Sequence, residues 1–375
     1  MRIGKKLKDF ICSGPASGIS NGLMTFLDVS AARLTGRRPR ELPILYLEVI
    51  QQCNLRCRHC GYASSYPVRG RLLSTDEWKQ ILTDASGLKT RIVSFSGGEP
   101  FLRDDLVELM QHAASCGLSV HVNSNGTLVD EAKARSLASV ENCAVIFSLD
   151  HADIAANDAV RGTGSFEAVR RAVANVRKVA PEVHVGLNTV IGPFNQGSLK
   201  AILDLGVAWG VQSVKYLPAH SNLNHSWRET PLQNSFVFGP EHIPAMRREL
   251  AVVKKSAAAY GITTNSKQFF QGVERYILGQ PTTPCYVGTM IGNVDPYGYL
   301  FPCYNYTEDS PNVLDGGIEK AWRSEGMKRL SKKVLSCDAS CWCSGYAEPS
   351  LRMNPLFFLK EPRQLVDDIR LYFLS

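Results

Sequence analysis

The sequence predicts an α/β fold in which six strand–helix units form a parallel sheet and a smaller, cysteine-rich region follows. The first supporting observation is that short apolar runs alternate with amphipathic helical segments from residue 44 to about residue 220. Such alternation gives a parallel sheet with right-handed crossovers. The second is length, because a closed barrel of eight units usually needs about 250 residues. Six units in about 175 residues therefore fit an incomplete barrel or an open doubly wound sheet.

The predicted strands are short runs rich in branched apolar residues. They span residues 44–50, 91–95, 118–123, 143–149, 183–190 and 214–217. The segments between them carry apolar residues at helical spacing. Ser74, with Glu77 three residues later, is typical of a capping box at the start of the first of these helices. The helices are expected over residues 75–86, 104–115, 131–139, 165–179 and 198–210.

The third observation is that the alternation stops after residue 220. Residues 221–239 predict a loop, and helices are expected over 241–259 and 268–278, with a short segment at 262–264 between them. Residues 289–304 predict a β-hairpin with its turn at 295–298. The expected organisation is a basic helical arm (1–43), the six-unit domain (44–220), a helical linker (221–283), a cysteine-rich domain (284–345) and an amphipathic tail (346–375).

Charge is concentrated at the N-terminus. The whole chain has a net charge of +7, and residues 1–40 alone carry eight Lys/Arg and two acids. Such an arm could meet anionic lipid, nucleic acid or an acidic substrate, or could simply be a solvated basic helix. Glycine, proline and asparagine interrupt residues 11–29, which argues against a signal peptide, and no apolar run is long enough to span a membrane. A cytoplasmic location is expected.

Both ends carry amphipathic helical patterns. Basic residues flank the N-terminal apolar stripe, which consists of Ile19, Leu23, Phe26, Leu27 and Leu34. At the C-terminus an apolar run at 356–359 precedes a helix expected from about Pro362, with Leu365, Val366, Ile369 and Phe373 on its apolar side. Such ends either pack on the body of the protein or lie in a membrane interface. The second possibility allows peripheral contact with the inner membrane surface and a lipid-linked substrate.

Three of the eleven cysteines follow the first predicted strand, as Cys53, Cys57 and Cys60. Three thiolates on one loop can surround a small metal centre. Without an export signal, metal is favoured over disulfides. Structural zinc usually has four ligands in paired CxxC spacing, whereas three cysteines suit an iron–sulfur cluster with one iron that lacks a protein ligand. Structural zinc remains the alternative at this point.

The CxxxCxxC motif after the first strand of a βα barrel resembles the signature of the radical S-adenosylmethionine (SAM) superfamily. The resemblance implies an incomplete (β/α)6 TIM-type barrel and a [4Fe–4S] cluster on Cys53, Cys57 and Cys60, whose fourth iron chelates SAM. It also implies an electron donor of the flavodoxin or ferredoxin type. Reductive cleavage of SAM would then give methionine and a 5′-deoxyadenosyl radical, which abstracts a hydrogen atom from the substrate.

Further motifs at the ends of later strands also resemble the family, and barrel active sites form at these ends. Taken singly they are also common turn sequences, but here they occur in chain order. The resemblance implies contacts with the methionine, carboxylate, ribose and adenine parts of SAM. The residues are Gly97, Gly98, Glu99, Pro100, Ser124, Asn125, Ser148, Asp150, Arg161, Asn188 and Val190. For His59, inside the cysteine loop, packing or an adenine contact is expected.

A second set of cysteines begins with Cys285 and Cys303, which flank the predicted hairpin and its turn residue Gly298. This spacing resembles the opening of the SPASM and twitch extensions of radical SAM enzymes, which bind auxiliary iron–sulfur clusters. Cys337 and Cys341 match a later cysteine pair of a full SPASM domain. The CxxC that precedes that pair in such a domain is absent, because its positions hold Lys328 and Ser331.

With Cys343, the second set has five cysteines, whereas two all-cysteine cubane clusters need eight. One auxiliary [4Fe–4S] cluster is therefore expected. Its safest ligands are Cys285, Cys303 and Cys341, and either Cys337 or Cys343 completes the site. Zinc and a purely structural cluster are the alternatives.

Tyr304 occupies the position at which some relatives carry an aspartate base. It is a candidate donor of a proton or hydrogen atom, or a packed aromatic residue. His220 and His225 follow the sixth strand and are candidate acid–base groups or ordinary loop histidines.

Taken together, the motifs predict a radical SAM enzyme that acts on a small molecule or a membrane-associated lipid intermediate, with the auxiliary cluster assisting substrate binding or electron transfer. One alternative is a ribosomal peptide maturase of the SPASM type, although the 43 residues before the barrel are too few for the N-terminal peptide-recognition domain of about 80 residues that many such relatives carry. A second alternative is a non-enzymatic iron–sulfur electron carrier. A nucleic-acid partner is not expected, because only the basic arm favours one.

Overall fold

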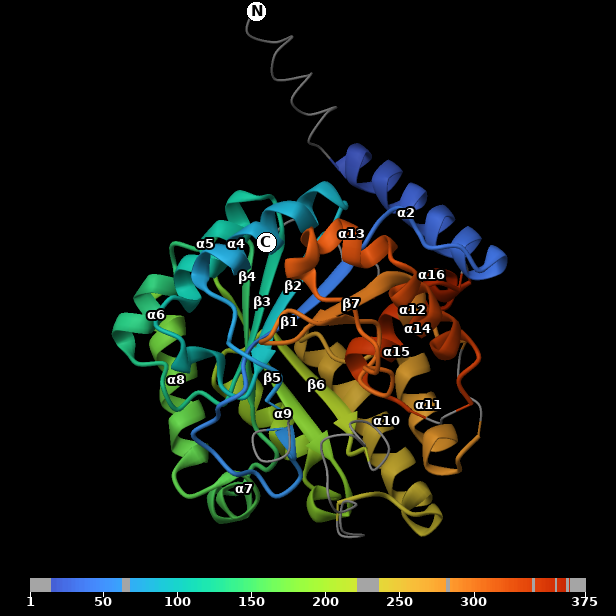
Figure 1. The fold of residues 1–375 in the computed structure, drawn as a ribbon. Helices are drawn as coiled ribbons and strands as arrows, with labels where there is room; N and C mark the ends of the chain where they lie inside the picture. Colours follow the sequence, from blue (N-terminus) through green and yellow to red (C-terminus); the bar gives the residue numbers. More distant parts are fainter. Residues whose placement is uncertain are drawn as a thin grey trace, which may run out of the picture.

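The computed structural model describes residues 15–62, 68–220, 236–280, 284–338, 341–354, 356–361 and 364, with side chains from residue 24 onward except that of Phe358. Within these residues the protein has one sheet with the strand order β6-β5-β4-β3-β2-β1-β7-β8. The first six strands run parallel, and the sheet curves without closing (Figure 1). This confirms the predicted α/β fold with an incomplete barrel. These strands are β1 (Ile44–Ile50), β2 (Ile92–Gly97), β3 (Ser119–Ser124), β4 (Cys143–Ser148), β5 (His184–Ile191) and β6 (Ser213–Pro218).

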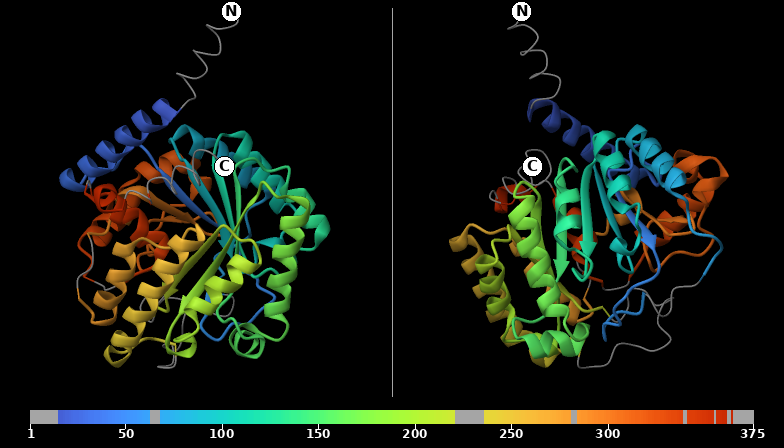
Figure 2. Two further views of the ribbon diagram at one scale, coloured as in Figure 1. Left: turned by 180° about the vertical axis from the view of Figure 1, so that it is seen from behind. Right: turned by 90° about the vertical axis from the view of Figure 1, so that its left-hand side faces the viewer.

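The two faces of the sheet differ in chemistry. Alternate residues of β1, among them Leu45, Leu47 and Val49, are completely buried in the main hydrophobic core. The helices between the strands cover this outer face (Figure 2). The residues between them, Tyr46 and Glu48, lie on the inner face, because successive side chains of a strand point to opposite sides. Polar side chains occupy equivalent positions on neighbouring strands, so the inner face can hydrogen-bond a ligand.

The helices that cover the first six strands begin and end close to their predicted limits. They are α4 (Thr75–Gly87), α5 (Leu106–Ser115), α6 (Glu131–Leu137), α8 (Ser165–Val179) and α9 (Leu199–Ala208). The predicted capping box is present, with Glu77 N donating to Ser74 Oγ and Ser74 N donating to the Glu77 carboxylate. A further helix, α7 (Ile154–Arg161), occupies part of a predicted loop. Asp153 caps it by accepting from Ala156 N, but eight residues are too few to show clear periodicity.

The predicted hairpin in the cysteine-rich region is confirmed as β7 (Ile291–Val294) and β8 (Leu300–Phe301), which pair antiparallel. Unexpectedly, β7 also pairs in parallel with β1, so the hairpin extends the main sheet (Figure 1). The helices α10 (Ile243–Tyr260) and α11 (Lys267–Ile277) agree with the prediction. The others in this half are α12 (Val287–Met290), α13 (Gly317–Arg323), α14 (Glu325–Leu335), α15 (Ser344–Arg352) and α16 (Phe357–Lys360).

The predicted N-terminal helix is present as α2 (Pro15–Thr35). One side of it packs on the cysteine-rich region, where Val29 is completely buried beside Val287 and Met290. Arg38 lies 3.5 Å from the centre of the Trp322 ring and donates a hydrogen bond to Gly288 O. The opposite side of α2 exposes apolar side chains. They are Met24, Leu27 and Leu34, with exposed fractions of 61%, 51% and 87%.

The apolar stripe of α2 is therefore divided between packing and exposure. The predicted stripe residues Ile19 and Leu23 lie outside the described side chains. At the other end of the chain, Phe357 of α16 is buried while Leu356 and Leu359 are exposed. The helix expected from Pro362 lies outside the described residues. Among the described helices, none has both the length and the apolar character required to cross a bilayer.

Candidate active site

The loop that carries Cys53, Cys57 and Cys60 follows β1 directly. Cys53 Sγ accepts hydrogen bonds from Leu55 N (3.4 Å) and from Asn125 Nδ2 at the end of β3 (3.8 Å). The Cys57 thiol donates to Arg161 O (3.7 Å). Cys60 is exposed, and Cys53 and Cys57 are half-buried. The loop is thus held by residues of β3 and α7 while its last cysteine faces solvent.

The donor set fits an iron–sulfur cluster. All three thiols are free and close enough to influence one another's ionisation. Burial raises the pKa of Cys57 to about 11, while the Arg161 charge acts to lower it. Among the described residues, no three potential ligands converge as they would around a single metal ion. A cluster spreads its thiolates farther apart than one ion does, and iron binding would displace their protons.

The Gly97–Gly98 pair ends β2 and lies against the backbone that leads into the cysteine loop. A Cβ atom on Gly97 would be 2.2 Å from Ile50 O, and one on Gly98 would be 2.0 Å from Gln52 O. Gly98 N and Glu99 N donate to these same two carbonyls at 2.9 Å. Only glycine permits this approach, so the motif fixes the start of the loop by backbone contact.

Glu99 is completely buried and connects the ends of two strands. Its carboxylate accepts from Ser124 Oγ (2.9 Å), Asn125 N (2.7 Å) and Phe101 N (3.2 Å). Burial raises the pKa of Glu99, and these hydrogen bonds oppose that shift. Pro100 begins a short 3-10 helix, Pro100–Leu102, and is buried. In this structure the Glu99 carboxylate is therefore bound by the chain itself.

A second network lies beside Cys53. Asn125 Nδ2 also donates to Asn54 Oδ1 (2.8 Å), and Thr127 Oγ1 donates to Asn125 Oδ1 (2.6 Å). Asn54 Nδ2 donates to Thr127 Oγ1 (2.7 Å). The sequence analysis did not single out Asn54, although it stands inside the CxxxCxxC motif. The network orients the Asn125 amide that reaches Cys53.

Asp150 and Arg161 form a buried ion pair next to the cysteine loop, with 2.7 Å between Arg161 Nε and Asp150 Oδ2. Val190 N donates to Asp150 Oδ1 (2.8 Å), and His59 Nδ1 lies 3.7 Å from Asp150 Oδ2. Four of the predicted site residues are thus together. Arg161 brings a positive charge to the Cys57 side of the loop, where an anionic group would be stabilised.

Of the remaining predicted residues, Ser148 and Asn188 lie on neighbouring strands of the sheet, and His220 lies after its last parallel strand. Asn188 Nδ2 donates to Asn123 Oδ1 (3.1 Å), and Ser148 pairs in register with Asn188. His220 follows β6, is 9% exposed and lies 4.8 Å from the Tyr276 ring, measured between centroids. His225 falls outside the described residues.

The second set of cysteines also comes together. Burial raises the pKa of the Cys341 thiol. Electrostatic repulsion raises it further, because four other thiols lie nearby, those of Cys285, Cys303, Cys337 and Cys343. Burial also raises the pKa of Cys303, to about 12. Cys343 precedes α15 and accepts hydrogen bonds from Gly345 and Tyr346 backbone N–H groups. The side chain of Cys337 is hydrogen-bonded to Tyr306.

Apolar and aromatic side chains pack against four of these thiols, those of Cys285, Cys303, Cys341 and Cys343. Val287, Met290, Val334 and Tyr346 form one buried cluster with Cys303. Tyr304 stacks on Tyr346, with 6.0 Å between ring centroids. The hydroxyl of Tyr304 hydrogen-bonds Glu48, which the sequence analysis also missed. Its signal was available, because Glu48 is a charged residue inside an otherwise apolar strand.

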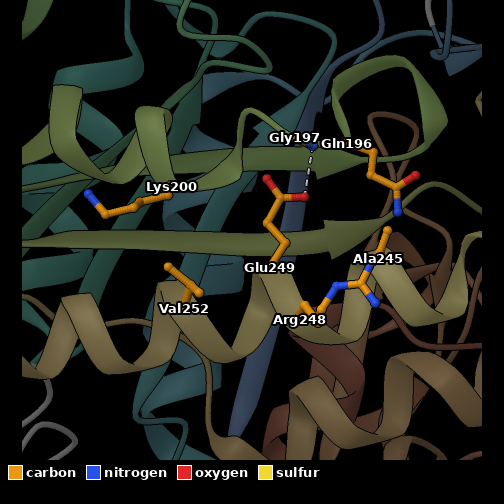
Figure 3. Close-up of a pocket in the computed structure, with 7 residues that line it drawn as sticks. All are labelled: Gln196, Gly197, Lys200, Ala245, Arg248, Glu249 and Val252. Carbon is orange, nitrogen blue, oxygen red and sulfur yellow. Dashed lines mark hydrogen bonds between the residues drawn. The ribbon is translucent and has the colours of Figure 1, made fainter.

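A separate hollow lies on the outer side of the protein, between α9 and α10 (Figure 3). In it the Glu249 carboxylate accepts from Gly197 N (2.8 Å) and Leu199 N (2.7 Å), and so caps the start of α9. None of the residues that line it belongs to the two cysteine sets. Its contacts are accounted for by helix capping.

Comparison with known proteins identifies relatives of this chain. The family model of the Radical SAM superfamily matches residues 47–206. The mycofactocin maturase MftC of Mycobacterium tuberculosis (strain CDC 1551 / Oshkosh) is 28% identical over 318 residues, which are 82% of this chain and 78% of that protein. The AdoMet-dependent heme synthase of Nitratidesulfovibrio vulgaris is 34% identical over 349 residues, which are 84% of this chain and 90% of that protein.

A solved structure with a similar fold is SuiB from Streptococcus suis bound to its precursor peptide SuiA. Its TM-score is 0.65 at 13% identity, and the alignment covers 82% of this chain and 70% of SuiB. The structure of SuiB bound to S-adenosylmethionine gives a TM-score of 0.64. These likenesses establish the fold.

Proposed function

The chain belongs to the radical SAM superfamily, and we propose that it cleaves SAM reductively and abstracts a hydrogen atom from a small-molecule or membrane-associated lipid substrate. Cys53, Cys57 and Cys60 would hold the [4Fe–4S] cluster. When bound, the cluster and SAM would supply a 5′-deoxyadenosyl radical. The observation that carries the proposal is the position of the three free thiols beside the buried Asp150–Arg161 pair, at the ends of the parallel strands.

The contacts of the other strand-end residues support the roles that we propose for them. The glycines of the Gly97–Gly98 pair set the start of the cysteine loop, and Glu99 holds the ends of β2 and β3 together. Asp150 holds the Arg161 guanidinium in place, so that its charge is available to the SAM carboxylate. The remaining proposed SAM contacts are Pro100, Ser124, Asn125, Ser148, Asn188 and Val190.

We further propose one auxiliary [4Fe–4S] cluster that assists substrate binding or electron transfer. Cys285, Cys303 and Cys341 would hold it, and Cys337 or Cys343 would complete the site. The electrostatic coupling of Cys341 with the other four thiols supports the proposal. Iron analysis after anaerobic reconstitution tests it, because two cubane clusters contain about eight iron atoms per chain and one contains about four.

Two observations support a small-molecule or lipid substrate. A small-molecule substrate is supported by the likeness to a heme synthase, which extends over 90% of that protein. A lipid-linked substrate is supported by the exposed apolar side of α2, formed by Met24, Leu27 and Leu34, because such a surface can lie in a membrane interface. The protein would then be cytoplasmic with peripheral membrane contact, and a flavodoxin- or ferredoxin-type protein would supply its electrons.

The second candidate is a maturase of ribosomal peptides. It is favoured by the likeness to MftC, which is named a mycofactocin maturase, and by the fold of SuiB, which is solved with its precursor peptide. A non-enzymatic electron carrier is a third possibility that the same assay addresses, because a carrier would not cleave SAM.

The test is 5′-deoxyadenosine formation by anaerobically reconstituted protein with SAM and dithionite. Lipid extract and the water-soluble fraction of the source cells are added separately. Stimulation by lipid alone supports the lipid substrate, and stimulation by the soluble fraction alone indicates a small molecule or a peptide. Protease treatment of the soluble fraction separates these two, because only a peptide substrate would be destroyed. Absence of 5′-deoxyadenosine from protein with a full iron content would overturn the proposed function.

A further inference from the structure

One buried acid on the inner face of the sheet has no part in the site described above. Glu48 lies in the middle of β1 and is 2% exposed. Its strand neighbours Leu47 and Val49 point into the hydrophobic core of the outer face, so the Glu48 side chain points inward. In the sheet register Glu48 stands opposite Ser96 of β2. The carboxyl group at this position therefore lies on the inner side of the curved sheet.

The contacts of Glu48 join the two cysteine sites. Tyr62, two residues after Cys60, donates its hydroxyl to Glu48 Oε2 at 2.9 Å. Tyr304, the residue after Cys303, is the second hydrogen-bond partner of the carboxyl. A protonated carboxyl group has one donor and several acceptor positions, so two tyrosine hydroxyls leave it able to bind a further group. The carboxyl therefore lies between two tyrosines, each of which stands within two residues of a cysteine of one set.

Glu48 is held as a largely neutral acid. Burial raises its pKa to about 8. The hydrogen bonds from Tyr304 and Tyr62 and the charge of Arg69 act against this shift, and the charge of Asp295 adds to it. A buried acid costs stability relative to an apolar side chain, so its presence in an apolar strand points to a functional role.

The neighbouring inner-face side chains are also uncharged hydrogen-bonding groups. Asn123 Nδ2 donates to Ser94 Oγ at 3.1 Å, and Asn188 donates in turn to Asn123. Burial lowers the pKa of His121 to about 4, which keeps its imidazole neutral at pH 7. A surface of this kind suits hydroxyl and amide groups better than it suits a carboxylate.

We propose that Glu48 is a substrate-binding residue whose carboxyl hydrogen-bonds a hydroxyl or amide group of the substrate, between the two cysteine sites. This inference rests on the proposed function, because it requires a substrate that is bound next to the SAM site. It assigns substrate recognition to a residue within β1, whereas the radical SAM motifs lie after β1 or at the ends of later strands.

The test compares Glu48→Gln and Glu48→Ala with wild type. The probe is the cell fraction, lipid or water-soluble, that stimulates 5′-deoxyadenosine formation by the wild-type protein. We expect E48A to need about 10-fold more of this fraction for half-maximal stimulation, and E48Q to stay within about threefold, because glutamine is a neutral hydrogen-bonding replacement. Glu249→Gln, which alters a carboxylate on the outer side, is the matched control.

A pH profile distinguishes binding from a merely structural role. The wild-type protein should require more of the fraction as the pH rises from 7 to 9 and Glu48 ionises, whereas E48Q should show no such change. The inference is overturned if E48A responds like wild type, or if E48Q is as weak as E48A. If E48A does not fold, identical pH profiles of E48Q and wild type overturn it. A wild-type protein that forms no 5′-deoxyadenosine would instead remove the proposed function and this inference with it.

Discussion

The two cysteine sites are built in opposite ways. Cys53, Cys57 and Cys60 lie on a loop whose neighbours are polar, and Cys60 is exposed. In the second set, aliphatic and aromatic side chains, including some from α2, pack against Cys285, Cys303, Cys341 and Cys343, and Cys303 is buried. A centre that must admit SAM needs an open side and polar partners. A centre that is completed by protein thiols alone needs neither, and burial shields it from solvent.

The largest expected effect is the loss of the open site. Cys57→Ala removes one of only three protein ligands, so the reconstituted protein should form 5′-deoxyadenosine at least about 10³-fold more slowly than wild type, which is about 4 kcal/mol in transition-state stabilisation. Chromatographic assay of 5′-deoxyadenosine measures this. Cys116→Ala, at a thiol remote from both sets, should retain wild-type activity. Comparable rates in C57A and wild type would mean that the loop does not hold the reactive cluster.

Loss of a ligand at the buried site should give a different result. In Cys303→Ala, iron content should fall from about eight to about four atoms per chain, because only the first cluster remains. SAM cleavage without substrate should stay within about threefold of wild type, because the open site is intact. Iron content is measured on the same samples as activity. If C303A lost all of its iron, the two sites would not be independent.

The ion pair beside the open site has a smaller expected effect. Asp150→Asn leaves the buried Arg161 charge without its partner and should reduce the free energy of unfolding by about 3 kcal/mol. SAM affinity should also fall, because Arg161 is no longer held in place. Thermal unfolding and SAM binding measure the two effects. Glu131→Gln removes an exposed partner of Lys178 and should cost much less stability, because solvent screens the pair. A loss in D150N no larger than that of E131Q would contradict this account.

The smallest expected effect is the pH dependence that Glu48 gives to the free energy of unfolding. Because the pKa of Glu48 is raised to about 8 in the folded protein, the unfolded chain loses this proton at lower pH than the folded protein does. As the pH rises from the pKa of Glu48 in the unfolded chain toward 8, this difference lowers the free energy of unfolding. Glu48→Gln removes this cost, so its unfolding free energy relative to wild type should increase by about 1.4 kcal/mol per pH unit between pH 6 and 7, and by about half of that near pH 8.

Denaturant titrations at several pH values measure this difference. The matched control is Glu249→Gln, whose difference from wild type should stay constant over this range. A difference between E48Q and wild type that does not change with pH would show that Glu48 is already ionised in the folded protein.

The six parallel strands could be predicted because each contains branched apolar residues in a short run between helical segments. The cysteine loop and the strand-end motifs could be predicted for the same reason, since each follows such a run. The helix α7 was missed because its eight residues give no clear periodicity. The pairing of β7 with β1 was missed because no local pattern in either strand specifies a partner more than two hundred residues away.

The contacts between individual side chains were the hardest feature to predict from the sequence. Glu48 contacts Tyr304 only because the hairpin joins the sheet next to β1. Asp150 and Arg161 were predicted as separate SAM contacts, and the structure shows that they form a pair. In the second case the sequence analysis identified both residues, but in both cases the partner depended on the tertiary fold.

The most direct test of the central claim is 5′-deoxyadenosine formation by wild-type protein, reconstituted anaerobically and supplied with SAM and dithionite, beside a variant in which Cys53, Cys57 and Cys60 are all alanine. The account predicts 5′-deoxyadenosine from wild type and none from the variant, which should still retain about four iron atoms per chain at the buried site. Equal amounts from both proteins, or none from wild-type protein with a full iron content, would contradict it.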